Sequence, residues 1–296
     1  MKIATFQGPL VFGDPEANLQ TTIASLKRAG EQGVEILCMP ETYLHGYFRS
    51  EQEARANSVD LNGEYFHSVL ERVKDFPTTL ILGLNELRDG KLFNTMVVIR
   101  EGKLLGRYSK NYLVFNYFNR GGEFPVFEQR GIPFGVVICA DTSYIEPARI
   151  LAMKGAQIIF TPHFNYINYQ NVEDHTWRVR QHQVAIAIDN DVYVARANVV
   201  VPESQGSKIF GSAGVGVGDA VILNRRGRVL AEAGLHTHTL LTVDIPDDDL
   251  KPKRSRPWQR CSPEMATAMY EQYQEMFGKH ANIDDRSANE RFNGLG

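Results

Sequence analysis

The chain repeats two of its own segments in the same order, and this repetition restricts the folds open to it. Residues 32–41 (QGVEILCMPE) are echoed by residues 154–163 (KGAQIIFTPH), and residues 94–106 (NTMVVIREGKLLG) are echoed by residues 219–231 (DAVILNRRGRVLA). The first pair is typical of a helix end leading into an apolar strand, and the second of two strands joined by a turn. Two echoes in one order predict two α/β halves related by approximate two-fold symmetry.

Strand and helix signals alternate along most of the chain, in agreement with this division. Asp14 and Pro15 supply an N-cap and a first helical residue, so a helix is expected from there to Gly33. A second helix is expected at residues 65–73. Strands are expected at residues 2–6, 34–39, 80–84, 95–100 and 104–108.

Three continuous apolar strands decide how the halves should pack. Residues 36–39, 136–139 and 158–161 have no polar face, so each needs cover on both sides. Two sheets packed face to face with helices outside supply that cover. The predicted fold is therefore an α/β four-layer αββα sandwich of two pseudo-symmetric halves.

The pattern changes near Pro246, which divides the chain into a domain at residues 1–245 and a C-terminal arm at residues 246–296. A polar stretch at residues 264–277 is expected to be helical, and the residues from Asp284 onward are expected to be frayed.

Composition excludes several classes of partner. The net charge is -3 and 23% of the 296 residues are charged, without a basic stripe for nucleic acid. No apolar segment approaches the ~20 residues of a membrane span, and the N-terminus lacks the pattern of a signal peptide. Three cysteines, an odd and sparse set, argue against a disulfide framework. We expect a cytoplasmic protein with a small-molecule substrate.

Cys139 lies between a short apolar run and an amphipathic segment, in FGVVICADTSYIEPARILAMKGA. A thiol at a sharp strand-to-helix turn points away from the sheet and faces the next backbone N–H groups, as in a nucleophile elbow. A cysteine that ends a buried strand can also be only a small apolar residue. The local sequence leaves both interpretations open.

A nucleophilic cysteine needs a proton acceptor, because a free thiol with a pKa of about 8.5 is mostly protonated near neutral pH. Histidine is the usual partner, and the chain has 8, but no local motif selects one. Glu41 is a second candidate, because it follows a strand directly after Pro40 and open α/β sheets gather their active sites at strand ends. The alternative is a glutamate on a surface loop.

Lys110 also follows a predicted strand, and an aromatic run comes after it. A lysine beside apolar rings is costly to bury without a charged partner. Lys110 therefore either reaches solvent or faces an anion.

Together these positions resemble the nitrilase superfamily, the carbon–nitrogen hydrolases. The resemblance covers roughly residues 1–245, with the motifs in the right order. The matching segments are Pro40-Glu41, Tyr108-Ser109-Lys110, Cys139-Ala140-Asp141, residues 146–149 (EPAR), Gly155-Ala156, residues 185–190 (AIAIDN), Ala197-Asn198, and residues 218–223 (GDAVIL) with Gly227.

The resemblance implies that residues 1–245 are a carbon–nitrogen hydrolase domain with the αββα fold. It implies assembly into a homodimer or higher homo-oligomer through the face that carries the second-half helices. It further implies that Cys139 is the nucleophile, Glu41 the general base and Lys110 the cation that stabilises a tetrahedral intermediate. The backbone N–H of Ala140 would share that last role. No metal or organic cofactor is implied.

One part of the family pattern is missing. Many members carry a second glutamate after the lysine, at a position that falls here near Val114 or Phe115, but residues 111–122 (NYLVFNYFNRGG) contain no carboxylate. Asn116 or Asn119 could orient the substrate instead. A degenerate site that serves only partner binding is the alternative. We favour an active enzyme, because nucleophile, base and cation are all present.

The loops after the strand ends predict the substrate-binding residues. They are rich in aromatic and hydroxyl groups, which indicates flat apolar walls with neutral hydrogen-bonding groups. His163 could equally be a structural histidine. The predicted substrate-binding residues are Tyr47, Tyr112, Asn116, Ala140, His163 and Asn165.

The leading functional hypothesis is a thiol hydrolase that cleaves a small linear amide or N-carbamoyl compound through a thioester and releases ammonia. Nitrile hydrolysis requires the same three residues and remains an alternative. A catalytically silent interaction module of the same fold is the third hypothesis.

Overall fold

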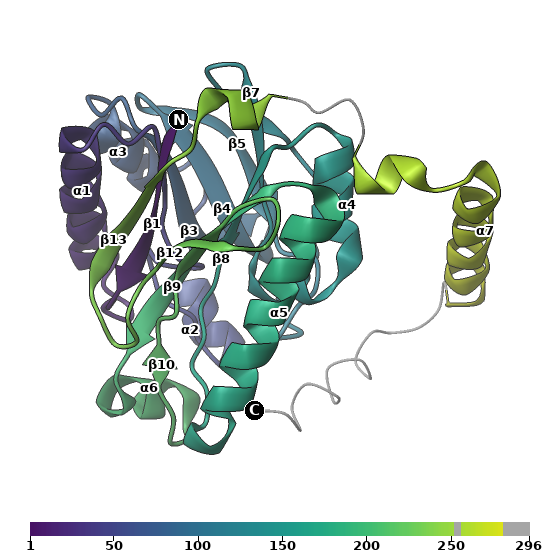
Figure 1. Cartoon of the computed structure of the whole chain (residues 1–296). Coiled ribbons are helices and arrows are strands. Elements are labelled where there is room, and N and C mark those ends of the chain that lie inside the picture. The colour runs from purple at the N-terminus through teal and green to yellow at the C-terminus, as the bar shows by residue number, and fades with distance from the viewer. Residues whose placement is uncertain (252–255, 281–296) are drawn as a thin grey trace.

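The computed structural model describes residues 1–251 and 256–280, and Figure 1 shows the course of the chain. The elements of the first half are β1(Lys2–Gly8), α1(Pro15–Glu31), β2(Ile36–Cys38), α2(Glu51–Ala56), α3(Glu64–Val73), β3(Thr79–Arg88), β4(Lys91–Arg100) and β5(Lys103–Ser109). Those of the second half are β6(Phe127–Gln129), β7(Ile132–Val136), α4(Ile145–Met153), β8(Ile158–Pro162), α5(Val172–Asn190), β9(Tyr193–Val201), α6(Glu203–Phe210), β10(Gly216–Val217), β11(Val221–Leu223) and β12(Val229–Glu232). They are followed by β13(Thr239–Asp244) and α7(Pro263–His280).

The strands form two sets that meet at one seam. The first set has the order β5-β4-β3-β2-β1, with β13 on the free side of β1, and the second has β6-β7-β8-β9, with β11 and β12 beyond β9. β1 and β9 pair in parallel at Gln7–Asn198 and Gly8–Val199. β13 thus returns the chain from the second half to the first.

Side chains alternate between two kinds of core, which confirms the predicted four layers. Ile36 of β2 packs between the sheets with Phe160 of β8, whereas Leu37 packs against the outer helices of the first half. Ile159 faces outward onto α4 and α5 of the second half. In Figure 1, α1 and α3 lie on one side of the sheets and α4 and α5 on the other. Both faces of each apolar strand are therefore covered.

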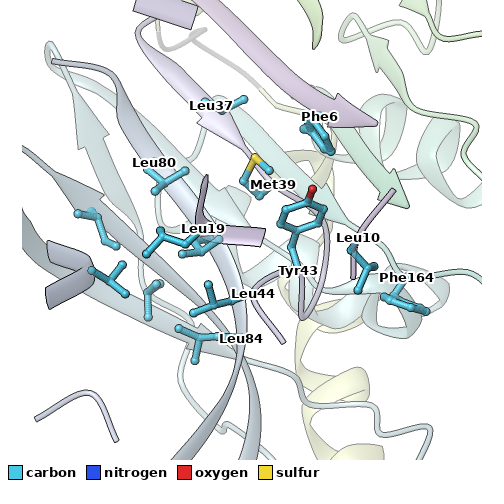
Figure 2. Packing of buried hydrophobic residues seen from close by; sticks show 14 of the residues in the cluster. Phe6, Leu10, Leu19, Leu37, Met39, Tyr43, Leu44, Leu80, Leu84 and Phe164 are labelled. Carbon is cyan, nitrogen blue, oxygen red and sulfur yellow. The ribbon is translucent and has the colours of Figure 1, made fainter. Parts of the chain in front are cut away.

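The outer core of the first half also anchors the turn after β2. Figure 2 shows Tyr43 and Leu44 beside Met39 and Leu19 in this cluster. The Tyr43 ring meets Phe6 edge-on at 5.3 Å between centroids, and its hydroxyl donates to the carbonyl of Pro9 at 2.8 Å. These contacts fix the backbone on which Glu41 lies.

Most of the predicted elements are confirmed. The Asp14 side chain caps α1 by accepting from the Ala17 N–H at 2.9 Å, and Gly33 adopts the positive φ of 69° after the helix. Residues 94–106 form the β4–β5 hairpin and residues 219–231 the β11–β12 hairpin, as their echo indicated. The predicted helix in the C-terminal arm is present as α7, which Figure 1 shows projecting from the sandwich.

Two strand predictions differ from the structure. Residues 34–39 form only the short β2(Ile36–Cys38), and the chain turns at Pro40, which has no N–H for a ladder. The strand predicted at residues 136–139 was wrong, because β7 ends at Val136 and a 3₁₀ turn begins at Cys139. The predicted fraying from Asp284 falls outside the described residues. No helix in the described ranges has the length and apolar character that crossing a membrane requires.

We predict that Gly83→Ala destabilises the protein by about 2 kcal/mol, because the new methyl overpacks a tight contact. A Cβ at Gly83 of β3 would lie 2.3 Å from the carbonyl oxygen of Pro40 and 2.5 Å from the Thr42 nitrogen. Urea unfolding measures the change.

Gly30→Ala is the matched control for this substitution. Gly30 lies in α1 and has open space around its Cβ position, so the same change should stabilise by about 0.5–1 kcal/mol. Equal effects of the two variants would contradict the close approach of β3 to the Glu41 turn.

Candidate active site

Three strand ends bring the predicted catalytic residues to one place. Lys110 follows β5 directly, and Glu41 and Cys139 each lie three positions after the last residue of β2 and β7. The Lys110 Nζ lies 2.6 Å from the Glu41 Oε1, and the two side chains are only 1% and 0% exposed. Cys139 is half-buried, and both charges act on its thiol. The buried carboxylate, the lysine and the thiol therefore form one cluster.

The Glu41 carboxylate is held by residues from both halves. Asn94 of β4 donates from its Nδ2 to Oε1 at 2.7 Å, and the backbone N–H of Phe164 donates to Oε2 at 2.8 Å. Neither partner was predicted. The only signal for Asn94 was its place as the polar first residue of the echoed segment 94–106. With Lys110, these donors fix both carboxylate oxygens of Glu41.

Cys139 lies on a strained turn. Its φ of 43° places a non-glycine residue in the left-handed region, which costs about 1–2 kcal/mol. The turn is held from within, since the Thr142 hydroxyl donates to the Cys139 carbonyl at 2.7 Å. This is the nucleophile-elbow geometry that the sequence indicated.

Asp141 connects this turn to the loop after Lys110. It accepts from the Tyr108 hydroxyl and from the Tyr112 N–H, each at 2.6 Å, and from the Asn111 N–H at 3.1 Å. Burial raises the pKa of Asp141 to about 6 even though these donors favour its charged form. Asp141 therefore positions the elbow relative to the lysine.

The electrostatics of the cluster keep the thiol protonated. Burial, followed by the negative charge of Glu41, raises the pKa of Cys139 to about 12, and Lys110 offsets only part of this. Burial alone would lower the pKa of Lys110, but the facing Glu41 carboxylate raises it well above its usual value. Lys110 is therefore charged at neutral pH, and sulfur can react only if a neighbouring base accepts its proton.

Tyr47 lies beside this cluster. Its ring centroid is 5.6 Å from the Lys110 Nζ, and the ring packs against Phe115, Phe118 and Phe164 at 5.1, 5.9 and 5.7 Å between centroids. Its buried hydroxyl has no hydrogen-bond partner among the described residues. Tyr47 thus provides an aromatic wall next to the lysine.

The other aromatic and loop candidates are placed differently. Tyr112 stacks on Tyr144 with centroids 3.5 Å apart, and its hydroxyl is 3.4 Å from Glu146. Asn116 is exposed, whereas the Asn119 side chain donates to the Leu92 carbonyl at 3.1 Å and so supports the loop. Ala140 follows Cys139 within the 3₁₀ turn. Substrate binding by Tyr112, Asn116 and Ala140 stays a prediction.

His163 is buried behind the site. Its Nδ1 contacts the Thr161 carbonyl at 2.8 Å, which assigns the proton to Nδ1. Burial and the positive charge of Arg196 lower the pKa of His163 well below its ordinary value. His163 is therefore neutral, and its backbone carbonyl accepts from the Glu41 N–H at 3.3 Å.

Asn165 approaches the sulfur directly. Its Nδ2 is 3.8 Å from the Cys139 Sγ, and its Oδ1 accepts from Arg196 of β9 at 2.7 Å. Arg196 is 2% exposed and also bonds Asp219 at 2.6 Å. Arg196 and Asp219 were missed, although a single charge inside the apolar run YVARANVVV requires a buried partner.

No group of three or more His, Cys, Asp or Glu side chains within the described ranges could hold a metal ion. The functional groups at the site are a thiol, a carboxylate, an ammonium and neutral amides.

Fold and cluster together define the class: a four-layer αββα protein with a cysteine-based site at converging strand ends. The comparison with known families agrees, since the model of the family described as Carbon-nitrogen hydrolase matches residues 2–255. The chain belongs to the carbon–nitrogen hydrolase family.

Similar proteins include amidases and a nitrilase. An (R)-stereoselective amidase from a Pseudomonas species is 28% identical over 86% of this chain and 88% of its own length. A nitrilase from Pyrococcus abyssi is 27% identical over 79% of this chain and 88% of its own length.

A solved amidase from Nesterenkonia superposes with a TM-score of 0.71 at 26% identity, over 86% of this chain and 93% of that one. One structure of that amidase holds butyramide, and another shows acrylamide added to its active-site cysteine.

The raised pKa of Cys139 predicts an unusual alkylation profile. Burial and the Glu41 carboxylate disfavour the thiolate, which is the reactive form of the thiol. The thiolate fraction should therefore keep growing about tenfold per pH unit beyond pH 8.5, where an ordinary thiol begins to level off. The iodoacetamide alkylation rate of Cys139, followed by peptide mass spectrometry, should therefore still rise between pH 8 and pH 10.

The same thiol in urea-unfolded protein is the control, since its rate should level near its ordinary pKa of about 8.5. A plateau below pH 9 in the folded protein would contradict the predicted environment of the sulfur.

Proposed function

We propose that the protein is a thiol amidase that hydrolyses small, linear, uncharged carboxamides and releases ammonia. The observation that carries the proposal is the buried contact of 2.6 Å between Lys110 and Glu41 beside the Cys139 thiol. Membership of the carbon–nitrogen hydrolase family and the similarity to amidases support it.

In the first half-reaction, sulfur attacks the amide carbon while Glu41 takes the thiol proton. This transfer is required because the pKa of Cys139 is raised to about 12. A C–S bond forms, and the negative charge on the carbonyl oxygen is stabilised by Lys110 and the Ala140 N–H. The C–N bond then breaks, the proton passes from Glu41 to nitrogen, and ammonia leaves a thioester on Cys139.

In the second half-reaction, water attacks the thioester and Glu41 takes one of its protons. The C–S bond breaks, the carboxylic acid leaves, and the sulfur recovers its proton from Glu41. One base therefore serves both steps. Because Lys110, Asn94 and the Phe164 N–H hold the carboxylate, Glu41 stays in place through both transfers.

Charge and shape favour a neutral acyl group. Among the described residues at the cluster, Lys110 is paired with Glu41 and already serves the reacting oxygen, and Arg196 is paired with Asp219, so neither offers a second, unpaired charge to a carboxylate elsewhere on the substrate. The aromatic wall around Tyr47 favours an apolar chain. Butyramide, which the similar Nesterenkonia amidase holds, has this chemistry.

We predict that the purified protein releases ammonia from short aliphatic amides such as butyramide. The panel should also include ω-amides of dicarboxylic acids, N-carbamoyl compounds and aliphatic nitriles, because a nitrile would use the same three residues. Ammonia is measured enzymatically, and intact mass spectrometry detects an acyl adduct.

Cys139→Ala should abolish both adduct and ammonia, and Glu41→Gln should lower turnover by at least about 100-fold. Glu41→Gln should also lower the melting temperature, because it leaves the buried Lys110 charge without its partner, and circular dichroism checks that the variant is still folded when turnover is measured. Cys261→Ala is the matched control, since Cys261 is an exposed thiol outside the cluster and should be dispensable. No ammonia and no adduct across the whole panel would sink the proposal and favour a silent interaction module. Near-normal turnover of Glu41→Gln would refute the assigned base.

A further inference from the structure

A buried arginine lies behind the reactive sulfur and is not used by the chemistry above. Arg196 of β9 is 2% exposed, and its Nη1 donates to both the backbone oxygen and the Oδ2 of Asp219 at 2.6 Å. Asp219 also accepts from Arg180 of α5 at 2.5 Å. A charge buried this deeply is costly unless its partners are fixed, so the Arg196 guanidinium has one defined orientation.

The other end of this guanidinium points at Asn165. The Arg196 Nη2 donates to the Asn165 Oδ1 at 2.7 Å, and the Asn198 Nδ2 donates to the same oxygen at 3.1 Å. Asn198 is itself fixed, because its Oδ1 accepts from the Val199 N–H at 3.0 Å. Two donors on one side determine which end of the Asn165 amide is the oxygen.

The amide nitrogen must therefore face the opposite way, toward Cys139. The Asn165 Nδ2 lies 3.8 Å from the Cys139 Sγ. A flipped amide would place its N–H groups against the N–H groups of Arg196 and leave both unpaired. The Asn165 N–H therefore points at the sulfur, and the Arg196 guanidinium sets this direction.

We propose that Arg196 is a positioning residue that holds the Asn165 amide as a hydrogen-bond donor to the Cys139 sulfur. The donor stabilises negative charge on sulfur as the thiol loses its proton to Glu41. This is needed because burial and the Glu41 carboxylate both disfavour the thiolate. The inference rests on the proposed role of Cys139 as nucleophile.

The test is the iodoacetamide alkylation rate of Cys139 at pH 9 in folded protein, since this rate reports thiolate stability without any amide turnover. Asn165→Ala should slow it about tenfold, the effect of losing one hydrogen bond to a charged acceptor. Arg196→Lys should slow it by a similar factor, because lysine can still pair with Asp219 but lacks the fork that also holds Asn165.

The double variant shows whether the arginine acts through the asparagine. If it does, Arg196→Lys combined with Asn165→Ala should react no more slowly than Asn165→Ala alone. The proposal would be overturned if the double variant were slower than Asn165→Ala by the full factor of Arg196→Lys. An unchanged alkylation rate in Arg196→Lys alone would also overturn it.

Arg225→Lys is the matched control. Arg225 is also buried, at 6% exposure, and pairs with Asp191 at 3.2 Å and Gln157 at 2.8 Å, without contact to Asn165. The Arg225→Lys variant should lose stability as Arg196→Lys does, but its Cys139 should be alkylated at the wild-type rate. A rate as slow as that of Arg196→Lys would show a general effect of buried charge and overturn the inference.

Asn165→Asp keeps the test decisive if Arg196→Lys does not fold. Aspartate retains the shape and a partner for Arg196, but an oxygen replaces the donor at sulfur, so alkylation should slow at least tenfold. A wild-type rate in this variant would refute the role of the amide. Absence of ammonia release from every amide would instead defeat the proposed function and leave the alkylation series interpretable.

Discussion

The ion pair between Lys110 and Glu41 is the interaction on which the rest of the site depends. Removing two charges from water costs on the order of several kcal/mol per ion, which only close partners can offset. Here the contact is 2.6 Å, and Asn94 and the Phe164 N–H satisfy the remaining capacity of the carboxylate. Because these groups come from β4, from the end of β5 and from the chain after β8, the ion pair requires both halves to be packed correctly.

The strained turn at Cys139 is held by the same surroundings. A positive φ at a non-glycine residue persists only where neighbouring structure determines it. Asp141 supplies this constraint through its bonds to Tyr108 and to the backbone after Lys110. Asp141 therefore positions both Lys110 and Cys139. Fold and site are coupled here, because the side chains that fix the elbow also fix the cation.

Much of the architecture and part of the site could be predicted from the sequence. The echoed segments indicated the paired halves, because the periodicity of apolar residues is a local signal. The strand ends made Glu41, Lys110 and Cys139 candidates, and the resemblance to the nitrilase superfamily supplied their roles. Asn94, Arg196 and Asp219 were missed. Asn94 meets a residue 53 positions away, and Arg196 meets Asn165 31 positions away. No local pattern encodes such contacts, although the lone arginine in an apolar strand could have shown that a buried partner must exist.

The sequence by itself determined the order of strands and helices, the apolar faces that require four layers, and the three reactive residue types at strand ends. These follow from side-chain periodicity and from the limits that proline and glycine place on the backbone. Only the tertiary structure decided which groups meet. The Phe164 N–H reaches Glu41 across 123 positions of sequence, and the direction of the Asn165 amide follows from the Arg196 guanidinium on β9. Both are set by the packing of the sheets, since desolvation forces each buried polar group to find a partner there.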